Sequence, residues 1–269
     1  MSDRRDPAPD PTGRDYAAWA EEMRRRTGEY GFFEDLGPDH HAQFTETEGD
    51  CLLVSFESFA ELQEAAGPGP RGREIAGAEG WSHLALVSRR RSWFRDPRIF
   101  GFFDQLDDDG LLDEFGTVLF HGAGPGGYAA CAYSVAAPGA RVLALAPQAT
   151  LDPRLTEWDG RFPEARRHSF TDRYGYAPEM LDAAAEASVL YDPRERLDAM
   201  HSALFVRRNV SRFRLPFMGD ALQGDLLDLD LIAPILSAAA SDQLDGLSFA
   251  RMMRRRRDHA PYLRKLLAR

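Results

Sequence analysis

The chain has 269 residues, of which 43% are hydrophobic, and a formal net charge of −10. This length is ample for a sizeable core, and we expect one large α/β domain. The acidic balance argues against general attraction to nucleic acid, and no run of about 18 apolar residues is present to cross a membrane. We therefore expect a soluble protein with no nucleic-acid and no membrane partner.

The N-terminal stretch MSDRRDPAPDPTGRD carries charges and prolines where an export signal needs an apolar segment. We expect a disordered tail over residues 1–15 and a cytoplasmic location. Two cysteines, Cys51 and Cys131, are too few for a disulfide framework and suit a reducing compartment. No cysteine and histidine cluster has zinc-site spacing, so no metal and no cofactor is expected.

Strands alternate with helices along the chain. The segment DYAAWAEEMRRRTGEY predicts a helix that ends at Gly28, and GPGPRGRE at 67–74 predicts a turn. Helical patterns lie at 126–137, 177–187 and 194–204. Apolar runs predict strands over 51–58, 82–88, 117–122, 141–147, 188–193 and 209–216. This alternation predicts a mostly parallel sheet with helices on both faces, whose ligands bind at the carboxyl ends of the strands.

The C-terminal part, from LPFMGDALQGD onward, predicts helices. We expect an α/β domain over 16–240 and a helical extension over 241–269. Arginine runs occur at 24–26, 89–91 and 254–257. The simplest interpretation of the last run is the solvated face of a terminal helix, and the alternative is a docking surface for an acidic partner.

A glycine cluster in VLFHGAGPGGYAACAYS (118–134) has two interpretations. The first is a dinucleotide turn, because Gly122, Gly124 and Gly127 have G-x-G-x-x-G spacing and GAGPGG is close to the flavoprotein sequence GAGPAG. It predicts an FAD- or NAD-dependent enzyme. Such a site needs an acidic residue at the end of the next strand, where this chain has Ala-Pro-Gln at 146–148.

The second interpretation uses the flanking segments. HGAGPGGYAA is followed by LALAPQATLDP, by VLYDPRERLDAMH, and by NVSRFRLP running into FMGDAL. Over roughly residues 50–235 these segments resemble a branch of the α/β-hydrolases. In that branch a strand leads into a G-S-S-M-G-G-Y nucleophile elbow, the next strand ends in Pro-Gln, and a later strand ends in Y-D-P before a second Asp and a His. The resemblance implies an α/β-hydrolase-like fold with a helical N-terminal extension and a helical C-terminus.

The catalytic positions implied by this resemblance are largely lost. The nucleophile position is Gly124, and the oxyanion-hole donor that follows it is Pro125, which has no N–H. The Gly-His pair of the base corresponds to Gly219 and Asp220. Only the acid is retained, as Asp192 or Asp198. Serine-hydrolase chemistry is therefore not expected, and the resemblance implies a binding or scaffolding role at the former cleft, for a small molecule or a protein partner.

Several residues follow the predicted strand ends and are candidates for ligand binding. Clustered at the cleft, Asp192, Asp198 and Asp220 could also act as acid and base or hold a divalent metal, although acidic residues are abundant in this chain. Cys131 and Ser134 fall inside the predicted helix, where a buried thiol is inert. The alternative is that the glycines only let strand and helix pack closely. The candidates for ligand binding at or after the predicted strand ends are Phe56, His121, Gly122, Gly124, Pro125, Gly126, Gly127 and His201.

Relatives of this appearance sometimes carry the label phosphoadenosine phosphosulfate reductase. That class of enzyme has an S-G-G-x-D-S phosphate loop and a catalytic cysteine in an E-C-G-x-H motif near the C-terminus. This chain contains neither motif and has no cysteine after Cys131. Its residues therefore do not support that chemistry.

Overall fold

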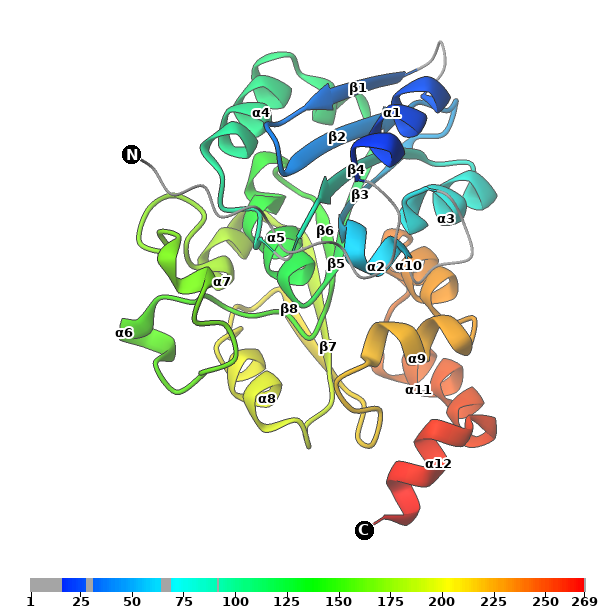
Figure 1. Cartoon of the computed structure of the whole chain (residues 1–269). Helices are drawn as coiled ribbons and strands as arrows, with labels where there is room; N and C mark the ends of the chain where they lie inside the picture. Colours follow the sequence, from blue (N-terminus) through cyan, green and yellow to red (C-terminus); the bar gives the residue numbers. More distant parts are fainter. Residues whose placement is uncertain (1–15, 28–30, 64–68, 91, 269) are drawn as a thin grey trace.

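The computed structural model describes residues 16–27, 31–63, 69–90 and 92–268, so the predicted tail at 1–15 lies outside the described residues. An eight-stranded sheet runs in the order β1-β2-β4-β3-β5-β6-β7-β8 (Figure 1). The β1–β2 and β2–β4 pairs are antiparallel, and the other five are parallel. The strands are β1 (Gly31–Asp35), β2 (His40–Thr45), β3 (Cys51–Ser58), β4 (Ser82–Ser88), β5 (Thr117–Ala123), β6 (Arg141–Leu145), β7 (Glu186–Tyr191) and β8 (Val210–Arg214).

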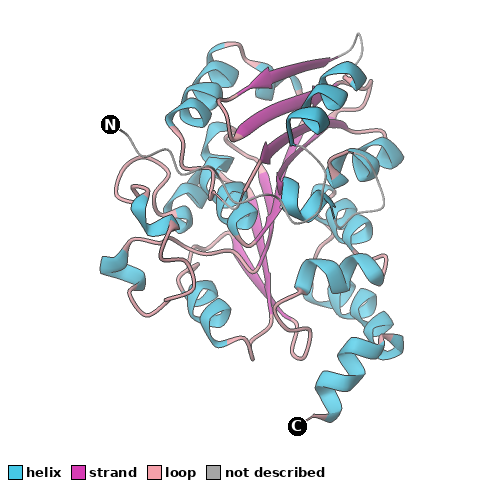
Figure 2. Ribbon diagram, viewed as in Figure 1, coloured by secondary structure: helices cyan, strands magenta, loops and turns pink. Residues whose placement is uncertain are grey.

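Helices cover both faces of the sheet, as predicted (Figure 2). Successive side chains of a strand point to opposite faces, so Leu52 and Leu53 of β3 enter different cores. The first core contains residues of α4 (Pro97–Asp108), α5 (Pro125–Tyr133) and α7 (Ala177–Met180). The second core contains residues of α3 (Arg71–Glu79), α9 (Leu222–Asp228), α10 (Ile232–Ala240) and α11 (Gly246–Met252).

The ends of the described chain are helical. At the N-terminus, α1 (Tyr16–Arg26) buries Trp19 and Met23 against β4 and against Phe59 and Leu62. At the C-terminus, Tyr262 of the last helix joins the second core. No helix in the described residues has the length and apolar character needed to cross a membrane. The remaining helices are α2 (Phe59–Gln63), α6 (Pro153–Thr156), α8 (Arg196–Ala203), α12 (Ala260–Leu267) and the 3-10 helices η1 (Leu111–Glu114), η2 (Ser134–Ala136), η3 (Ala165–Arg167), η4 (Leu181–Ala183) and η5 (Met253–Asp258).

The six predicted strands are confirmed with small shifts at their ends, but β1 and β2 were missed. In β2 the polar side chains of His40, His41 and Gln43 are buried together with the apolar ones. This removes the apolar and polar alternation that marks a half-buried strand. The predicted helix at 177–187 is also shorter, because α7 passes into η4 and β7 begins at Glu186.

The turn predicted at 67–74 is wrong from Arg71 onward, where α3 begins. The segment is rich in proline and glycine, which predicts a turn. In the structure the buried carboxylate of Glu57 accepts hydrogen bonds from the N–H groups of Arg71 at 2.8 Å and Gly72 at 3.0 Å. A carboxylate at this position satisfies N–H groups that have no partner inside the helix. A tertiary contact from β3 therefore starts this helix.

Candidate functional site

A sharp turn joins β5 to α5 at Gly124. Its backbone has φ 51° and ψ −115°, a combination that side-chain-bearing residues adopt only with strain. The Gly124 N–H donates to the C=O of Leu145 at 2.8 Å, and its C=O accepts from the N–H of Tyr128 at 3.0 Å. A Cβ atom built on Gly124 meets no atom within 4 Å. Strain, rather than lack of space, therefore disfavours a side chain at this turn.

Two neighbouring glycines let α5 approach the sheet. A Cβ on Gly122 would lie 2.3 Å from the backbone carbonyl group of Gly126. A Cβ on Gly126 would lie 2.3 Å from the carbonyl oxygen of Phe56 on β3. These two glycines therefore have a packing role, which was the alternative considered from the sequence.

A cavity of about 570 Å³ opens beside Gly124. Its walls come from the carboxyl ends of β5 and β6, from α2 and α3, from the segment between β6 and β7, and from the start of α9. Parallel strands place their carboxyl ends at one edge of the sheet, where such folds bind ligands. The lining residues are Glu61, Arg71, Ala123, Gly124, Pro125, Leu145, Ala146, Gln148, Arg161, Phe162, Asp198, Asp220, Ala221, Leu222, Gln223 and Gly224.

The acid position lies beneath this cavity. Asp192 follows β7 and is only 2% exposed. Its Oδ2 accepts from the N–H of Gly219 at 2.6 Å, and its Oδ1 accepts from the N–H of Arg194 at 2.8 Å. The next residue after Gly219 is Asp220, which lines the cavity together with Gly124. The nucleophile and base positions of the resemblance, Gly124 and Asp220, thus line one cavity. The hydrogen bond from Gly219 holds the loop that carries Asp220 next to Asp192.

Asp198 lines the cavity and belongs to an ionic network that continues into the interior. Its Oδ1 lies 2.7 Å from Arg161, whose guanidinium also binds Asp159 at 2.8 Å. The Nε2 of His201 lies 2.9 Å from the Asp159 carboxylate, and its Nδ1 accepts from the N–H of Ala149 at 3.1 Å. Because Nδ1 is an acceptor, Nε2 carries the proton and donates to Asp159. His201 is therefore fully buried and occupied within the network, and it does not line the cavity.

The ionisation of Asp159 follows from these contacts. Burial by itself raises the pKa of this carboxyl group. The hydrogen bonds from His201 and Arg161 favour the ionised form and outweigh burial, so the pKa of Asp159 is lowered. The lowered pKa keeps the Asp159 carboxylate ionised. Its negative charge holds the Arg161 guanidinium in place at the cavity wall.

His121 and Phe56 lie behind the cavity wall. The Nδ1 of His121 donates to the C=O of Leu143 at 2.9 Å, and burial lowers the pKa of His121 to about 4. Phe56 is 2% exposed, and its ring stacks on Phe103 and Tyr133 in the core. Both side chains are buried and absent from the cavity lining, so any effect they have on a ligand is indirect.

The thiol of Cys131 is fully buried in α5, as predicted from its place in the helix. Burial raises the pKa of this thiol far above its usual range. A thiol that does not ionise is not a nucleophile. Ser134 is also fully buried, and its hydroxyl donates to the C=O of Cys131 at 2.9 Å.

The position of the ribose-binding acid in a dinucleotide site is held by Gln148. Its Oε1 accepts from the indole N–H of Trp93 at 3.0 Å, and its Nε2 donates to the C=O of Ala146 at 3.3 Å. No carboxylate stands there, and both ends of the amide are engaged by the protein. No contact in the described residues favours the dinucleotide interpretation.

Three candidate aspartates act electrostatically on one neighbour, Glu195. Burial raises the pKa of the Glu195 carboxyl group, and the charges of Asp220, Asp192 and Asp198 raise it further. Each of these residues lies in a segment that follows β7 or β8, two parallel neighbours whose carboxyl ends share one edge of the sheet. Sequence reasoning did not single out Glu195.

Other cavity residues were also missed, among them Glu61, Arg71, Arg161 and Gln223. None of these four belongs to a motif. Their only signal in the sequence is that each lies in a segment that follows a strand, and such segments gather at the ligand-binding edge of a parallel sheet.

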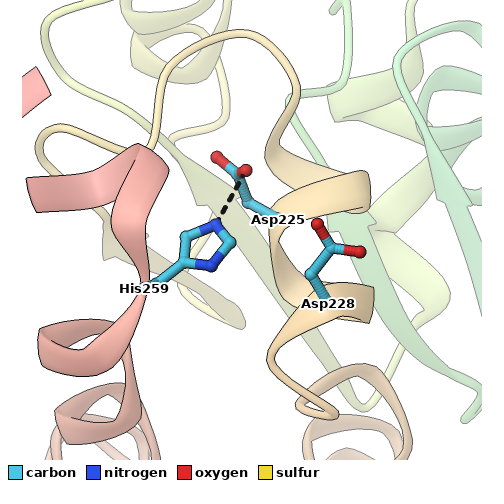
Figure 3. Close-up of side chains that lie close together, drawn as sticks. All are labelled: Asp225, Asp228 and His259. Carbon is cyan, nitrogen blue, oxygen red and sulfur yellow. Dashed lines mark hydrogen bonds and ion pairs between the residues drawn. The ribbon is translucent and has the colours of Figure 1, made fainter. Parts of the chain in front are cut away.

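A second polar cluster ties the C-terminus to the loop that carries Asp220 (Figure 3). The Nε2 of His259 lies 3.0 Å from Oδ1 of Asp225, and the Nζ of Lys265 lies 3.3 Å from Oδ2. Lys265 also donates to the C=O of Met218. Asp225, Asp228 and His259 each offer a ligand atom within 4.8 Å of the others, a spacing that suits a metal ion. The Lys265 ammonium already supplies positive charge there, and the contacts hold α12 against the 218–225 segment.

Comparison with known proteins bears on the fold alone. No family model matches the sequence, and no curated protein matches it. Est1E from Butyrivibrio proteoclasticus has a similar structure, with a TM-score of 0.50 at 13% identity, covering 80% of this chain and 99% of that chain. The esterase domain of a Rhodothermus marinus protein gives a TM-score of 0.49 at 13% identity, covering 77% and 95%. The mouse alpha/beta hydrolase domain-containing protein 10 gives 0.48 at 10% identity, covering 80% and 100%.

The strand order, the turn at Gly124 and the similarity to Est1E define one fold class. The chain has an α/β-hydrolase fold, as the resemblance implied.

Proposed function

We propose that this chain is a catalytically degenerate protein of the α/β-hydrolase fold, whose former active-site cleft binds a ligand without hydrolysing it. One observation carries the proposal: Gly124, Pro125 and Asp220 line the same cavity. They stand where the resemblance places the nucleophile, an oxyanion donor and the base. These groups act as a unit in serine hydrolases, so losing all three removes the mechanism.

The cleft itself is retained. Its volume of about 570 Å³ is typical of sites for small molecules. The Arg161 guanidinium is shared between Asp159 and Asp198, whereas Arg71 donates through one terminal nitrogen to the C=O of Glu61. The Nε of Arg71 is buried and has no hydrogen-bond partner within the described residues. A ligand with an acceptor group, such as a carboxylate or a phosphate, would satisfy this donor.

A thermal-shift screen against carboxylic acids, sugars, nucleotides and acyl-CoAs tests binding. A ligand at about 100 times its Kd stabilises the folded state by about 2.7 kcal/mol. Gly224→Phe adds a large side chain at the cavity wall, where a Cβ meets no atom within 4 Å. Gly101→Phe makes the same change in α4, away from the cavity, and is the matched control. The ligand should stabilise the control and not Gly224→Phe, and equal stabilisation of both would refute binding in this cleft.

A fluorophosphonate probe tests the absence of hydrolase chemistry. We expect no labelling of the native protein, because no serine or cysteine side chain among the described residues lines the cavity. Stoichiometric labelling of a serine near the cleft would show that a nucleophile is present and would overturn the proposal.

Restoring the lost groups tests the origin of the cleft. The triple variant is Gly124→Ser, Pro125→Met and Asp220→His, and the new serine has open space at residue 124. Pro125→Met restores a backbone N–H, and such an oxyanion donor typically stabilises the transition state by about 2.7–4 kcal/mol. We expect weak hydrolysis of nitrophenyl acetate, faster than by the wild type or by Gly124→Ser alone. A folded triple variant no faster than the wild type would contradict the assignment of these three positions.

A further inference from the structure

A second groove, of about 510 Å³, lies along β8, the last strand in the sheet order. Within the described residues β8 pairs only with β7, so its outer edge is open. The consecutive residues Arg212, Phe213 and Arg214 all line the groove, and α11 and η5 form its other wall. It shares no lining residue with the cavity at Gly124.

The groove is strongly cationic in a protein whose formal net charge is −10. None of its arginines has an ion-pair partner in the part of the chain that the structure describes. Arg255 belongs to the same arginine run but does not line the groove, and it pairs with Asp230 at 3.8 Å. The unneutralised arginines of the groove are Arg212, Arg214, Arg254, Arg256 and Arg257.

The floor between these arginines is apolar. The rings of Phe213 and Phe249 pack with their centroids 4.6 Å apart, and Met253 lies beside them. Gly246 has no side chain and Ala250 has only a methyl group, which leaves room above the floor. A fitting ligand therefore combines acidic groups with apolar ones.

The backbone of β8 offers hydrogen bonds to the same groove. Ala187 donates to the C=O of Asn209 at 2.9 Å, and Leu215 donates to the C=O of Tyr191 at 2.8 Å. Because N–H and C=O groups alternate in direction along a strand, the odd-numbered residues of β8 face β7. Arg212 and Arg214 consequently present their backbone groups to the open edge. An unpaired strand edge is a template for an added strand.

We propose that the β8 edge binds an extended acidic segment of a partner protein as an added strand, with its carboxylates paired to the arginines of the groove. Two copies of this chain joined through β8 would bring like charges together, which opposes self-association. The net charge of −10 opposes binding of long nucleic acids. Charge complementarity and the open strand edge thus favour the same occupant.

The experiment uses a fluorescein-labelled peptide, Glu-Val-Glu-Val-Glu-Val-Glu, and fluorescence anisotropy. We expect saturable binding to the full chain that weakens as salt is raised, because exposed ion pairs are screened. Arg254→Glu with Arg257→Glu should weaken binding by about tenfold or more, since two attractions become repulsions. Both side chains are exposed, so the fold should persist, as circular dichroism would check.

The control variant Arg90→Glu with Arg196→Glu changes the net charge equally at exposed positions outside the groove. It should bind the peptide within about twofold of the wild type, as expected for exposed charges beyond screening distance. Equal losses in the two double variants would show attraction by overall charge alone and overturn the proposal.

The strand geometry has its own test. A peptide N-methylated at alternate residues keeps its charge but loses the N–H groups that would pair with β8. It should bind at least about tenfold more weakly than the parent peptide when methylated on the face that meets β8. Equal binding by all methylated peptides would refute an added strand. The proposal would also be overturned if single-stranded DNA bound more tightly than the peptide. It would be overturned as well by concentration-dependent dimers that are lost in the variant Arg254→Glu with Arg257→Glu.

Discussion

The glycines around the turn at residue 124 should respond to alanine in a definite order. A Cβ on Gly122 would lie 2.3 Å from the carbonyl group of Gly126, whereas ordinary contacts lie at 3.4–4 Å. Backbone atoms cannot rotate away, so α5 must shift by about 1 Å, and we expect Gly122→Ala to lower the free energy of unfolding by about 3 kcal/mol or more. Gly124→Ala meets no atom and suffers only backbone strain, which costs about 1–3 kcal/mol.

A third variant calibrates the series. Gly101 lies inside α4, where a Cβ meets no atom within 4 Å and φ is not positive. Gly101→Ala should therefore stabilise the protein by about 0.5–1 kcal/mol. Urea titrations followed by tryptophan fluorescence measure all three free energies. If Gly122→Ala destabilises no more than Gly124→Ala, close approach of α5 to the sheet is not what requires glycine at residue 122.

The ionic network and the buried histidines make two further predictions. Asp159→Ala should lower the free energy of unfolding by about 3–5 kcal/mol, because it leaves His201 and Arg161 without their carboxylate partner. The control Asp104→Ala breaks an exposed ion pair, so it should cost less than about 1 kcal/mol. Similar losses for both variants in urea titrations would contradict the importance of the network. Burial lowers the pKa of His40 and lowers the pKa of three other histidines to about 4 or about 3, so the unfolded chain binds more protons below pH 6.5. The free energy of unfolding should then fall as the pH drops from 6.5 to 4, by up to about 1.4 kcal/mol per pH unit for each histidine. A free energy of unfolding that stays constant in urea titrations between pH 7.5 and 5 would refute this prediction. The three other histidines are His41, with a pKa lowered to about 4, His83, lowered to about 3, and His121, lowered to about 4.

Local patterns were enough for most of the sheet and for the turn. The apolar runs at 51–58 and 82–88 correspond to β3 and β4 residue for residue, because strand periodicity is a property of adjacent residues. The spacing of Gly122, Gly124 and Gly127 identified the strand-to-helix turn for a similar reason, since glycine is needed where backbone groups approach closely.

Contacts between distant residues decided the rest. β2 is a strand although it buries His41 and Gln43, because Tyr16 and Thr27 hydrogen-bond these side chains across the fold. The start of α3 depends on Glu57, which lies on another element.

Both proposed binding surfaces likewise depend on tertiary structure. Arg71 and Arg161 meet at one cavity, and Arg212 and Arg254 meet at one groove, only because the sheet brings segments far apart in the chain to a common edge. Hydrophobic periodicity specifies which face of an element is buried, but it carries no information about which polar side chains will face each other. That pairing is determined when the layers pack.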